Sequence, residues 1–518
     1  MITRHRFAAA FLLALAACAR PAPAPTTDDR PRLAVLVVVD QLREPLLERY
    51  DDLFTGGLRR LIDEGRVYTR ATHDHARTVT AAGHATLATG TWPMHHGIVG
   101  NEWWERTPAG WTMVSNVGDS TVRIVDAPTI PGVSPHYLQR SGIAEWMLAA
   151  DSGSRIASVS LKDRGAVLPA GRTKGQVYWF EPDVARFVTS TYYRNSYPDW
   201  VTRFNTREVQ RLAADTVWTS TIPAAALARS LPDTMASEGN GVHTFFQHRY
   251  SAEARNASLA AWLETTPMLD ALALRFARTA VEELALGRDA VPDFLNVSLS
   301  QTDRIGHAYG PNSREMLDNL LRLDRGLGEF LAFLDARVGR GRWVLALSAD
   351  HGSVVPPEGE TPGREPLAHR VTAEERQALR AVYADSLDPE RMVAALKRLP
   401  FVADAWTSAQ LMNATPTDSV ATLFRRSMFA GREGSDFGRW GVEVNYTEGF
   451  LTNARGTSHG RPYWYDRHVP LIFFGPGIAR GRDSTRVSTT DLAPTLARLA
   501  RVAFPSDVDG KALPVGGR

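Results

Sequence analysis

Two pairs of acidic and histidine residues lie close enough along the chain to share metal ions. Asp303 and His307 stand four residues apart, so one helical turn would place both side chains on the same face. Asp350 and His351 are adjacent and directly follow an apolar run. Either pair alone is more often part of a hydrogen-bonded turn than a ligand pair. Together, without a thiol nearby, they suit zinc or a similar divalent metal and suggest a two-metal site.

A threonine at the start of a helical segment offers an oxygen nucleophile. Thr80 opens the segment 80–89, TAAGHATLAT. The free N–H groups and the dipole at a helix N-terminus favour an anion there. Taken alone, a threonine at this place is more often the N-cap of an ordinary helix. A role in chemistry therefore requires the metal-binding groups to lie beside it.

These side chains need a sheet to position them, and the sequence predicts one. Short apolar, β-branched runs alternate with helical patterns such as 314–336, which is typical of buried parallel strands in an α/β sheet. Ligands bind at the carboxyl ends of such strands. The predicted strands are 33–39, 155–161, 294–299, 343–347 and 469–474, and the polar residues that follow the first four are Asp40, Lys162 with Arg164, Asp303, and Asp350 with His351.

We therefore predict an α/β fold with a doubly wound, mostly parallel sheet, helices on both faces and one catalytic domain over residues 31–518. Two stretches, 167–288 and 354–449, lack the strand–helix rhythm and are predicted as insertions that cap the sheet edge. The chain has no Walker-type phosphate loop and no glycine-rich dinucleotide fingerprint. The sequence therefore does not support a function driven by nucleotide hydrolysis or a hydride-transferring enzyme.

The composition indicates a large globular protein. The chain has 518 residues, 44% of them hydrophobic, and a formal net charge of +2. No run of Lys or Arg provides the basic surface that nucleic-acid binding needs, so nucleic acid is not expected as a partner. The single cysteine cannot form an internal disulfide. Only four residues are lysines, which singles out Lys162 at its strand end.

Taken in order along the chain, the motifs resemble those of the alkaline phosphatase superfamily, in particular the PafA-like bacterial alkaline phosphatases with a threonine nucleophile and a type I phosphodiesterase/nucleotide pyrophosphatase-like fold. The resemblance runs from about residue 33 to the helix near residue 491. The motifs that carry it are VVVDQ (37–41), TAAGHA (80–85), GIVGN (97–101), SLKDRG (160–165), DRIGH (303–307), ADHG (349–352) and SHG (458–460).

The resemblance implies two zinc ions per chain and a covalent phosphothreonine intermediate on Thr80, which water then hydrolyses. The phosphoryl oxygens would be held by Lys162, Arg164 and the Asn101 amide. One zinc would be bound by Asp303, His307 and His459, and the other by Asp40, Asp350, His351 and the Thr80 oxygen.

Lys162 and Arg164 also predict the substrate class. Diester-cleaving members of the superfamily resemble this chain at Thr80 and Asn101 but lack the Lys/Arg pair, because a diester has one fewer charged oxygen to bind. The chain is therefore expected to release inorganic phosphate from small phosphate monoesters. Two alternatives remain: a phosphodiesterase of the same superfamily, and a non-catalytic metal- or phosphate-binding lipoprotein.

The first 17 residues are predicted to be a lipoprotein-type signal peptide. Arg4 and Arg6 precede an apolar core at 7–17, and the sequence LAAC at 15–18 resembles a lipobox, in which Cys18 would be acylated. Residues 18–30, rich in Pro and Ala, are expected to form a tether. We expect a monomer, exported to the periplasm or cell surface of a bacterium and anchored through Cys18. The alternative is an ordinary secretory signal with a chance cysteine.

Overall fold

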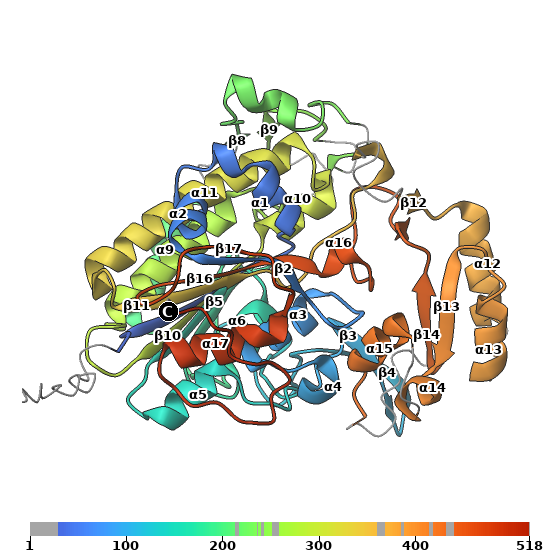
Figure 1. Ribbon diagram of the computed structural model, residues 1–518, viewed down its shortest axis with the longest axis horizontal. Coiled ribbons are helices and arrows are strands. Elements are labelled where there is room, and N and C mark those ends of the chain that lie inside the picture. Colours follow the sequence, from blue (N-terminus) through green and yellow to red (C-terminus); the bar gives the residue numbers. More distant parts are fainter. Residues whose placement is uncertain are drawn as a thin grey trace, which may run out of the picture.

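The structure is a computed structural model that describes residues 30–212, 217–235, 237–239, 243–250, 258–359, 368–384, 388–413, 418–430 and 440–516. Its centre is a ten-stranded sheet (Figure 1). The predicted signal peptide, Cys18 and nearly all of the predicted tether lie outside the described residues. Among the described helices, none combines the length and apolar character that crossing a bilayer requires.

Five neighbouring parallel strands form the middle of the sheet, and their side chains are almost entirely buried. This confirms the mostly parallel α/β fold, since continuous apolar runs can lie only in a sheet that is covered on both faces. In spatial order the strands are β11 (Trp343–Ser348), β1 (Leu33–Val39), β10 (Asp293–Leu299), β5 (Ile156–Ser160) and β6 (Gln176–Glu181).

Helices cover both faces of this sheet, as a doubly wound fold requires (Figure 1). Alternate residues of β1 point to opposite sides. Val35 and Val37 pack in the core beneath α2 (Gly57–Glu64), α9 (Met268–Glu283) and α11 (Arg314–Leu334). Leu36 and Val38 pack in a second core with α5 (Ile143–Ala150) and α17 (Leu492–Leu499), and α3 (Thr80–Thr89) and α6 (Asp163–Ala170) lie on this side too.

The edges of the sheet differ from the prediction. The predicted strand at 469–474 exists as β16 (His468–Phe474), but it runs antiparallel to β11 and to β2 (Arg66–Thr72). A buried apolar run fits either direction, because burial on both faces does not depend on strand polarity. Beyond β16 the sheet continues through β2 to β17 (Gly481–Asp483) and β18 (Val487–Ser488), and β7 (Arg186–Val188) closes the other edge.

Part of the first predicted insertion, 167–288, belongs to the main sheet. It contributes β6 and β7, and α9 packs against β5 and β10. The rest forms α7 (Asp199–Leu212), α8 (Leu259–Leu263) and the short pair β8 (Val217–Trp218) and β9 (His248–Arg249). The apolar faces of β6 and α9 pack in the main sheet. The aromatic-rich composition of this stretch led to its prediction as an insertion.

The second predicted insertion folds beside the sheet with an apolar cluster of its own, and we call its described part the cap (Figure 1). Its two-stranded sheet is formed by β13 (Val402–Thr407) and β14 (Val442–Tyr446). Its helices are α12 (Ala373–Ala384), α13 (Pro389–Leu396), α14 (Ser408–Asn413) and α15 (Ser419–Arg426). The remaining elements named here are α1 (Glu44–Arg49), α4 (Pro93–His96), β3 (Glu102–Thr107), β4 (Gly110–Ser115), α10 (Gln301–Tyr309), β12 (His369–Arg370), β15 (Phe450–Leu451) and α16 (Trp464–Arg467).

Candidate active site

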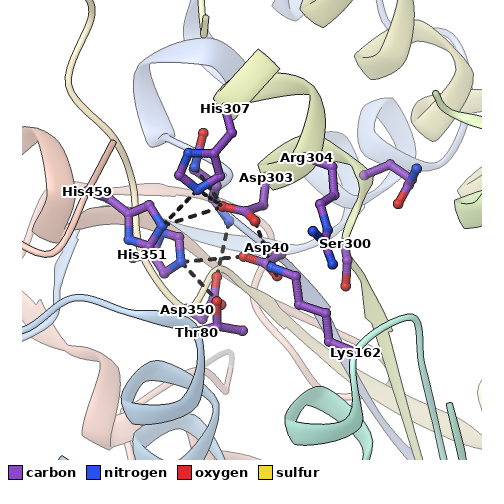
Figure 2. A network of polar contacts seen from close by, with 12 residues as sticks. Asp40, Thr80, Lys162, Ser300, Asp303, Arg304, His307, Asp350, His351 and His459 are labelled. Carbon is purple, nitrogen blue, oxygen red and sulfur yellow. Dashed lines mark hydrogen bonds and ion pairs between the residues drawn. The ribbon is translucent and has the colours of Figure 1, made fainter. Parts of the chain in front are cut away.

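The carboxyl ends of the central strands deliver polar side chains to one place (Figure 2). Asp40 follows β1, Lys162 lies two residues beyond β5, and Asp350 lies two residues beyond β11. Asp303 lies on α10, which begins directly after β10. Since these strands are parallel neighbours, their ends meet at the same edge of the sheet.

Six predicted metal ligands form two groups. In each group the candidate ligand atoms all lie within 4.8 Å of one another. Oxygen and nitrogen atoms about 2 Å from a common zinc ion are necessarily this close. The first group is Asp303, His307 and His459, and the second is Asp40, Asp350 and His351.

Backbone carbonyl groups fix the orientation of the three histidine rings. Nδ1–H of His307 donates to the Thr457 carbonyl at 2.9 Å, and Nδ1–H of His459 donates to the Thr78 carbonyl at 2.8 Å. His351 makes the corresponding bond to Gly352 at 3.0 Å. Each ring therefore turns Nε2 toward the carboxylates, as metal-binding histidines do when their other nitrogen is hydrogen-bonded.

Two atoms that face the centre of the second group, Asp40 Oδ1 and His351 Nε2, are buried and make no hydrogen bond. Asp350 Oδ2 is buried too, with His84 Nδ1 3.2 Å away. Buried polar atoms of this kind are costly unless something binds them. Their carboxylate and imidazole chemistry fits a divalent cation such as zinc.

Lys162 connects the two groups. Its Nζ lies 2.5 Å from Asp40 Oδ2 and 2.6 Å from Asp303 Oδ2, and its side chain is 4% exposed. Figure 2 shows the lysine reaching up between the carboxylates from the end of β5. One ammonium therefore contacts a carboxylate from each group.

Burial and mutual charge shift the pKa values of these groups in opposite directions. Burial raises the pKa of Asp40 well above its usual range, and the neighbouring carboxylates raise it further. Burial also acts to raise the pKa of Asp303, but Lys162 and His307 hold it well below its usual range. For His351 and His459 burial lowers the pKa, which favours the neutral, metal-binding form of the imidazole.

Thr80 lies at the first position of α3, against the second group. Its residue is 1% exposed, and the preceding Val79 is extended and provides no side-chain cap. The N–H of Ala81 donates to Asn101 Oδ1 at 2.9 Å, so the Asn101 amide lies beside the threonine. The structure thus brings Thr80 and Asn101 together at a helix N-terminus.

Comparison with known proteins agrees with this geometry. Residues 34–361 match the family model "Type I phosphodiesterase / nucleotide pyrophosphatase". The chain is 31% identical to alkaline phosphatase PafA of Elizabethkingia meningoseptica, over 93% of this chain and 94% of that protein. It is 30% identical to alkaline phosphatase PhoV of Synechococcus elongatus, over 95% of this chain and 94% of that protein.

The chain belongs to the type I phosphodiesterase/nucleotide pyrophosphatase family. Within it the chain is a PafA-like alkaline phosphatase, an enzyme of the phosphoric monoester hydrolase class. The crystal structure of wild-type PafA superposes with a TM-score of 0.83 at 30% identity, covering 94% of this chain and 99% of that one. A solved PafA variant, with a threonine, an asparagine, a lysine and an arginine substituted, superposes with a TM-score of 0.84 at the same identity and coverage.

The Arg164 guanidinium contacts a neighbouring residue, Asp163, and not the two ligand groups. The backbone N–H and the guanidinium of Arg164 both contact Asp163 Oδ1, at 2.7 and 3.4 Å. The second contact is long and the side chain is 23% exposed, so little holds the guanidinium in this orientation. Arg164 stands four residues beyond the end of β5, near the strand end that carries Lys162.

Two residues that contact the site were not predicted to do so. The Gln41 backbone N–H donates to Asp350 Oδ1, and its side-chain amide donates to Asp303 Oδ1 at 2.7 Å. His84 donates through Nδ1 to the Thr80 carbonyl, and the same nitrogen lies 3.2 Å from Asp350 Oδ2. Two features of the sequence could have revealed these contacts. His84 stands one helical turn after Thr80, and Gln41 belongs to the VVVDQ motif.

Two glycines let the elements of the site approach closely. A Cβ atom at Gly83 would lie 2.1 Å from the Asp350 carbonyl oxygen, and one at Gly306 would lie 2.0 Å from Gln41 Oε1. A side chain at Gly83 would push α3 away from the backbone of Asp350, and one at Gly306 would displace the Gln41 amide. These spacings explain why glycine stands inside both helices, where it otherwise weakens a helix.

The site is closed on one side and open on the other. The side chains of Asp40, Asp350 and His351 are 0% exposed, while the side chain of His307 is 36% exposed. Solvent therefore reaches these residues at His307 of the first group.

Proposed function

We propose that this chain is a zinc-dependent alkaline phosphatase that hydrolyses phosphate monoesters through a phosphothreonine at Thr80. The observation that carries the proposal is the pair of ligand groups, one on each side of Lys162, with Thr80 at a helix N-terminus beside the second. Ligand type, buried unbonded atoms and ring orientation all favour zinc in both groups.

The charge of the site supports a dianionic substrate. Three carboxylates and one ammonium leave two negative charges, and two divalent ions would convert these to two positive charges. Once metal ions neutralise Asp40 and Asp303, the Lys162 ammonium has donors available for a phosphoryl oxygen. When bound, the ions would supply Lewis-acid stabilisation of the attacking and leaving oxygens.

The chain's own residues would divide the reaction between them. The Thr80 hydroxyl loses its proton to water as its oxygen attacks phosphorus, the ester P–O bond breaks, and the leaving oxygen takes a proton from water to become the alcohol. Lys162, Arg164 and the Asn101 amide hold the equatorial phosphoryl oxygens, where negative charge is greatest. Water then cleaves the phosphothreonine and releases inorganic phosphate.

The residue types support monoesters over diesters. Lys162 and Arg164 provide two cations for oxygens that a monoester carries charged. The four PafA residues replaced in the solved variant, a threonine, an asparagine, a lysine and an arginine, are of the same types as Thr80, Asn101, Lys162 and Arg164. The second candidate, a diesterase, is favoured only by the name of the family model.

The proposal extends to location. The basic start, apolar core and LAAC sequence of residues 1–18 support export and acylation at Cys18. The enzyme would then act as a monomer in the periplasm or at the cell surface, on small phosphate monoesters that reach the compartment.

The deciding experiment compares p-nitrophenyl phosphate with bis-p-nitrophenyl phosphate, from neutral to alkaline pH, for protein treated with chelator and then given zinc. We expect zinc to restore activity and the monoester to be strongly preferred. Preference for the diester would favour the second candidate, and no activity on either ester would favour a non-catalytic binding protein.

A further inference from the structure

The segment 76–79, which leads directly into Thr80, is held by the cap. Ser427, just after α15, accepts hydrogen bonds through Oγ from the N–H groups of Ala76 at 2.8 Å and Arg77 at 3.1 Å. The same hydroxyl donates to the Leu423 carbonyl at 3.0 Å. Ser427 is 1% exposed, so water does not substitute for these bonds.

A second contact holds the same segment through charge. The Arg77 guanidinium donates to Glu443 Oε2 at 2.6 Å, and the Glu443 side chain is 1% exposed. Glu443 lies on β14, which pairs with β13 in the cap sheet. A charge-assisted bond to a buried carboxylate is stronger than a neutral one and constrains its partner more closely.

Apolar packing completes the attachment. Ala76 belongs to the same buried cluster as Leu411, Leu423, Phe424 and Met428, all from the cap. The Ala76 N–H also lies 3.0 Å from the Leu423 carbonyl. The cap therefore contacts main chain and side chains of residues 76–77 from several directions.

The next residues of this segment belong to the site. The Thr78 carbonyl accepts the Nδ1–H of His459, which orients that ring, and Thr80 carries the oxygen proposed as the nucleophile. Only two residues separate Arg77 from Thr80. A shift of residues 76–77 would thus move both the His459 ring and the Thr80 oxygen.

We propose that Ser427 and Glu443 are positioning residues, through which the cap sets the place of Thr80 and His459. The inference rests on the proposed function, because it assumes that Thr80 is the nucleophile. Misplacing a reacting atom by about 1 Å can lower a rate by about 10²-fold. The cap then serves the chemical step as well as covering the site.

The test compares Ser427→Ala and Glu443→Gln with wild type in the zinc-loaded full chain. We expect kcat for p-nitrophenyl phosphate to fall by about 10- to 100-fold, with KM and the inhibition constant of inorganic phosphate changed less than about threefold. Zinc content should stay at the wild-type level. Ser427→Thr, which keeps the hydroxyl, should have a kcat close to that of wild type, unlike Ser427→Ala.

Two variants of the cap serve as controls. Thr422→Ala removes a hydroxyl on α15 that bonds to the Asp418 carbonyl, and Asp404→Asn removes the Lys397–Asp404 ion pair on the outer side of the cap. Both should keep kcat. If cap substitutions acted only through stability, they would lower the unfolding temperature while the kcat of the folded protein stayed the same.

A kcat within about threefold of wild type in folded Glu443→Gln and folded Ser427→Ala would overturn the proposal. Where Ser427→Ala does not fold, Glu443→Gln alone decides. Thr80→Ala separates the two claims: turnover by that variant rejects the nucleophile itself, whereas an inactive Thr80→Ala beside fully active cap variants rejects only the positioning role.

Discussion

The single positive charge of Lys162 is involved in two interactions, one with carboxylates and one proposed with the substrate. In this structure its ammonium contacts Asp40 and Asp303, while the proposed reaction needs it at a phosphoryl oxygen. Both interactions are possible if divalent ions take over the neutralisation of the carboxylates. The affinity of the site for metal and its affinity for phosphate should therefore be linked through this residue.

The oxygen of Thr80 is the proposed nucleophile, so Thr80→Ala should lower turnover by about 10³-fold or more. The fold and zinc content should persist, because Asp40, Asp350 and His351 remain as ligands of the second group. Steady-state assays together with metal analysis check this. Thr80→Ser, which keeps a hydroxyl, is the matched control, and near-normal turnover by Thr80→Ala would reject the mechanism.

Lys162 and Arg164 are proposed to bind charged phosphoryl oxygens. Replacing both by Ala should lower kcat/KM for a monoester by about 10²-fold or more, since charge-assisted bonds contribute roughly 1.5–3 kcal/mol each. The loss for a diester should be clearly smaller, because a diester has fewer charged oxygens. Arg140→Ala, which removes an arginine paired with Asp507 on the surface, is a control. Equal losses for both esters would contradict the assignment.

At this scale the sequence predicted residue types better than contacts. The strand-end position of Asp40, Lys162 and Asp350 was readable from apolar runs that end in polar residues. The roles of His459 and Asn101 came from the family resemblance. His459 is brought to the site by folding across more than a hundred residues, and Asn101 is brought there by a loop. The bridging of two carboxylates by Lys162 depends on side-chain geometry that no spacing encodes.

Helix α3 lies directly against the loop that carries Asp350, and Gly83 makes this possible. Gly83→Ala would place Cβ 2.1 Å from the Asp350 carbonyl oxygen, so helix and loop must separate. We expect zinc affinity and kcat both to fall, each by about tenfold or more, since ligand and nucleophile move apart. Zinc titration and steady-state kinetics measure the two effects.

Gly326→Ala is the matched control for this change. Gly326 also lies inside a helix, α11, but a Cβ there meets only the end of the Leu274 side chain, at 3.0 Å. It should leave activity intact and stabilise its helix slightly, since Ala is the better helix former. Unchanged zinc affinity in Gly83→Ala would show that the close approach does not position Asp350.

Four of the five parallel strands in the middle of the sheet were predictable, while the fifth, β6, and the strands toward the edges were not. Strand β1 lies at the predicted residues, and β5, β10 and β11 start or end within a residue of the prediction. Each is buried on both faces and therefore continuously apolar. Strand β2 (Arg66–Thr72), next to the edge strands β17 and β18, mixes an exposed arginine with buried residues and carries no such run. The composition of β16 does not reveal its direction.

The whole molecule is proposed to be tethered to a membrane through Cys18. Cys18→Ser should move the protein from the membrane fraction to the soluble fraction, because serine has no thiol to carry the lipid. The specific activity of the enzyme should not change, since the described domain begins well after this residue. Fractionation of cells that produce either form measures the distribution, and an unchanged membrane fraction would argue against a lipid anchor.

Buried acids in separate parts of the molecule should make its stability depend on pH. Asp270 lies on α9 and accepts hydrogen bonds from the N–H groups of Ser300 and Gln301 at the start of α10. Burial nevertheless raises the pKa of Asp270 to about 7. Burial, with Glu315 and Asp233 nearby, raises the pKa of Glu238 to about 9. In this range the native state holds protons that the unfolded chain has released, so the free energy of unfolding falls as pH rises.

Between pH 5 and its native pKa, each acid should lower the free energy of unfolding by up to about 1.4 kcal/mol for each unit that the pH rises. Asp270→Asn should therefore gain stability relative to wild type up to about pH 7, and Glu238→Gln up to about pH 9. Urea unfolding of the zinc-loaded proteins at several pH values checks this, and comparing variants at the same pH cancels the pH dependence of zinc binding itself. Asp183→Asn, at an exposed position, is the control. The difference in free energy of unfolding between Glu238→Gln and wild type could instead stay constant from pH 5 to pH 9. Glu238 would then be ionised in the native protein, and its charge would need a cation beside Glu315.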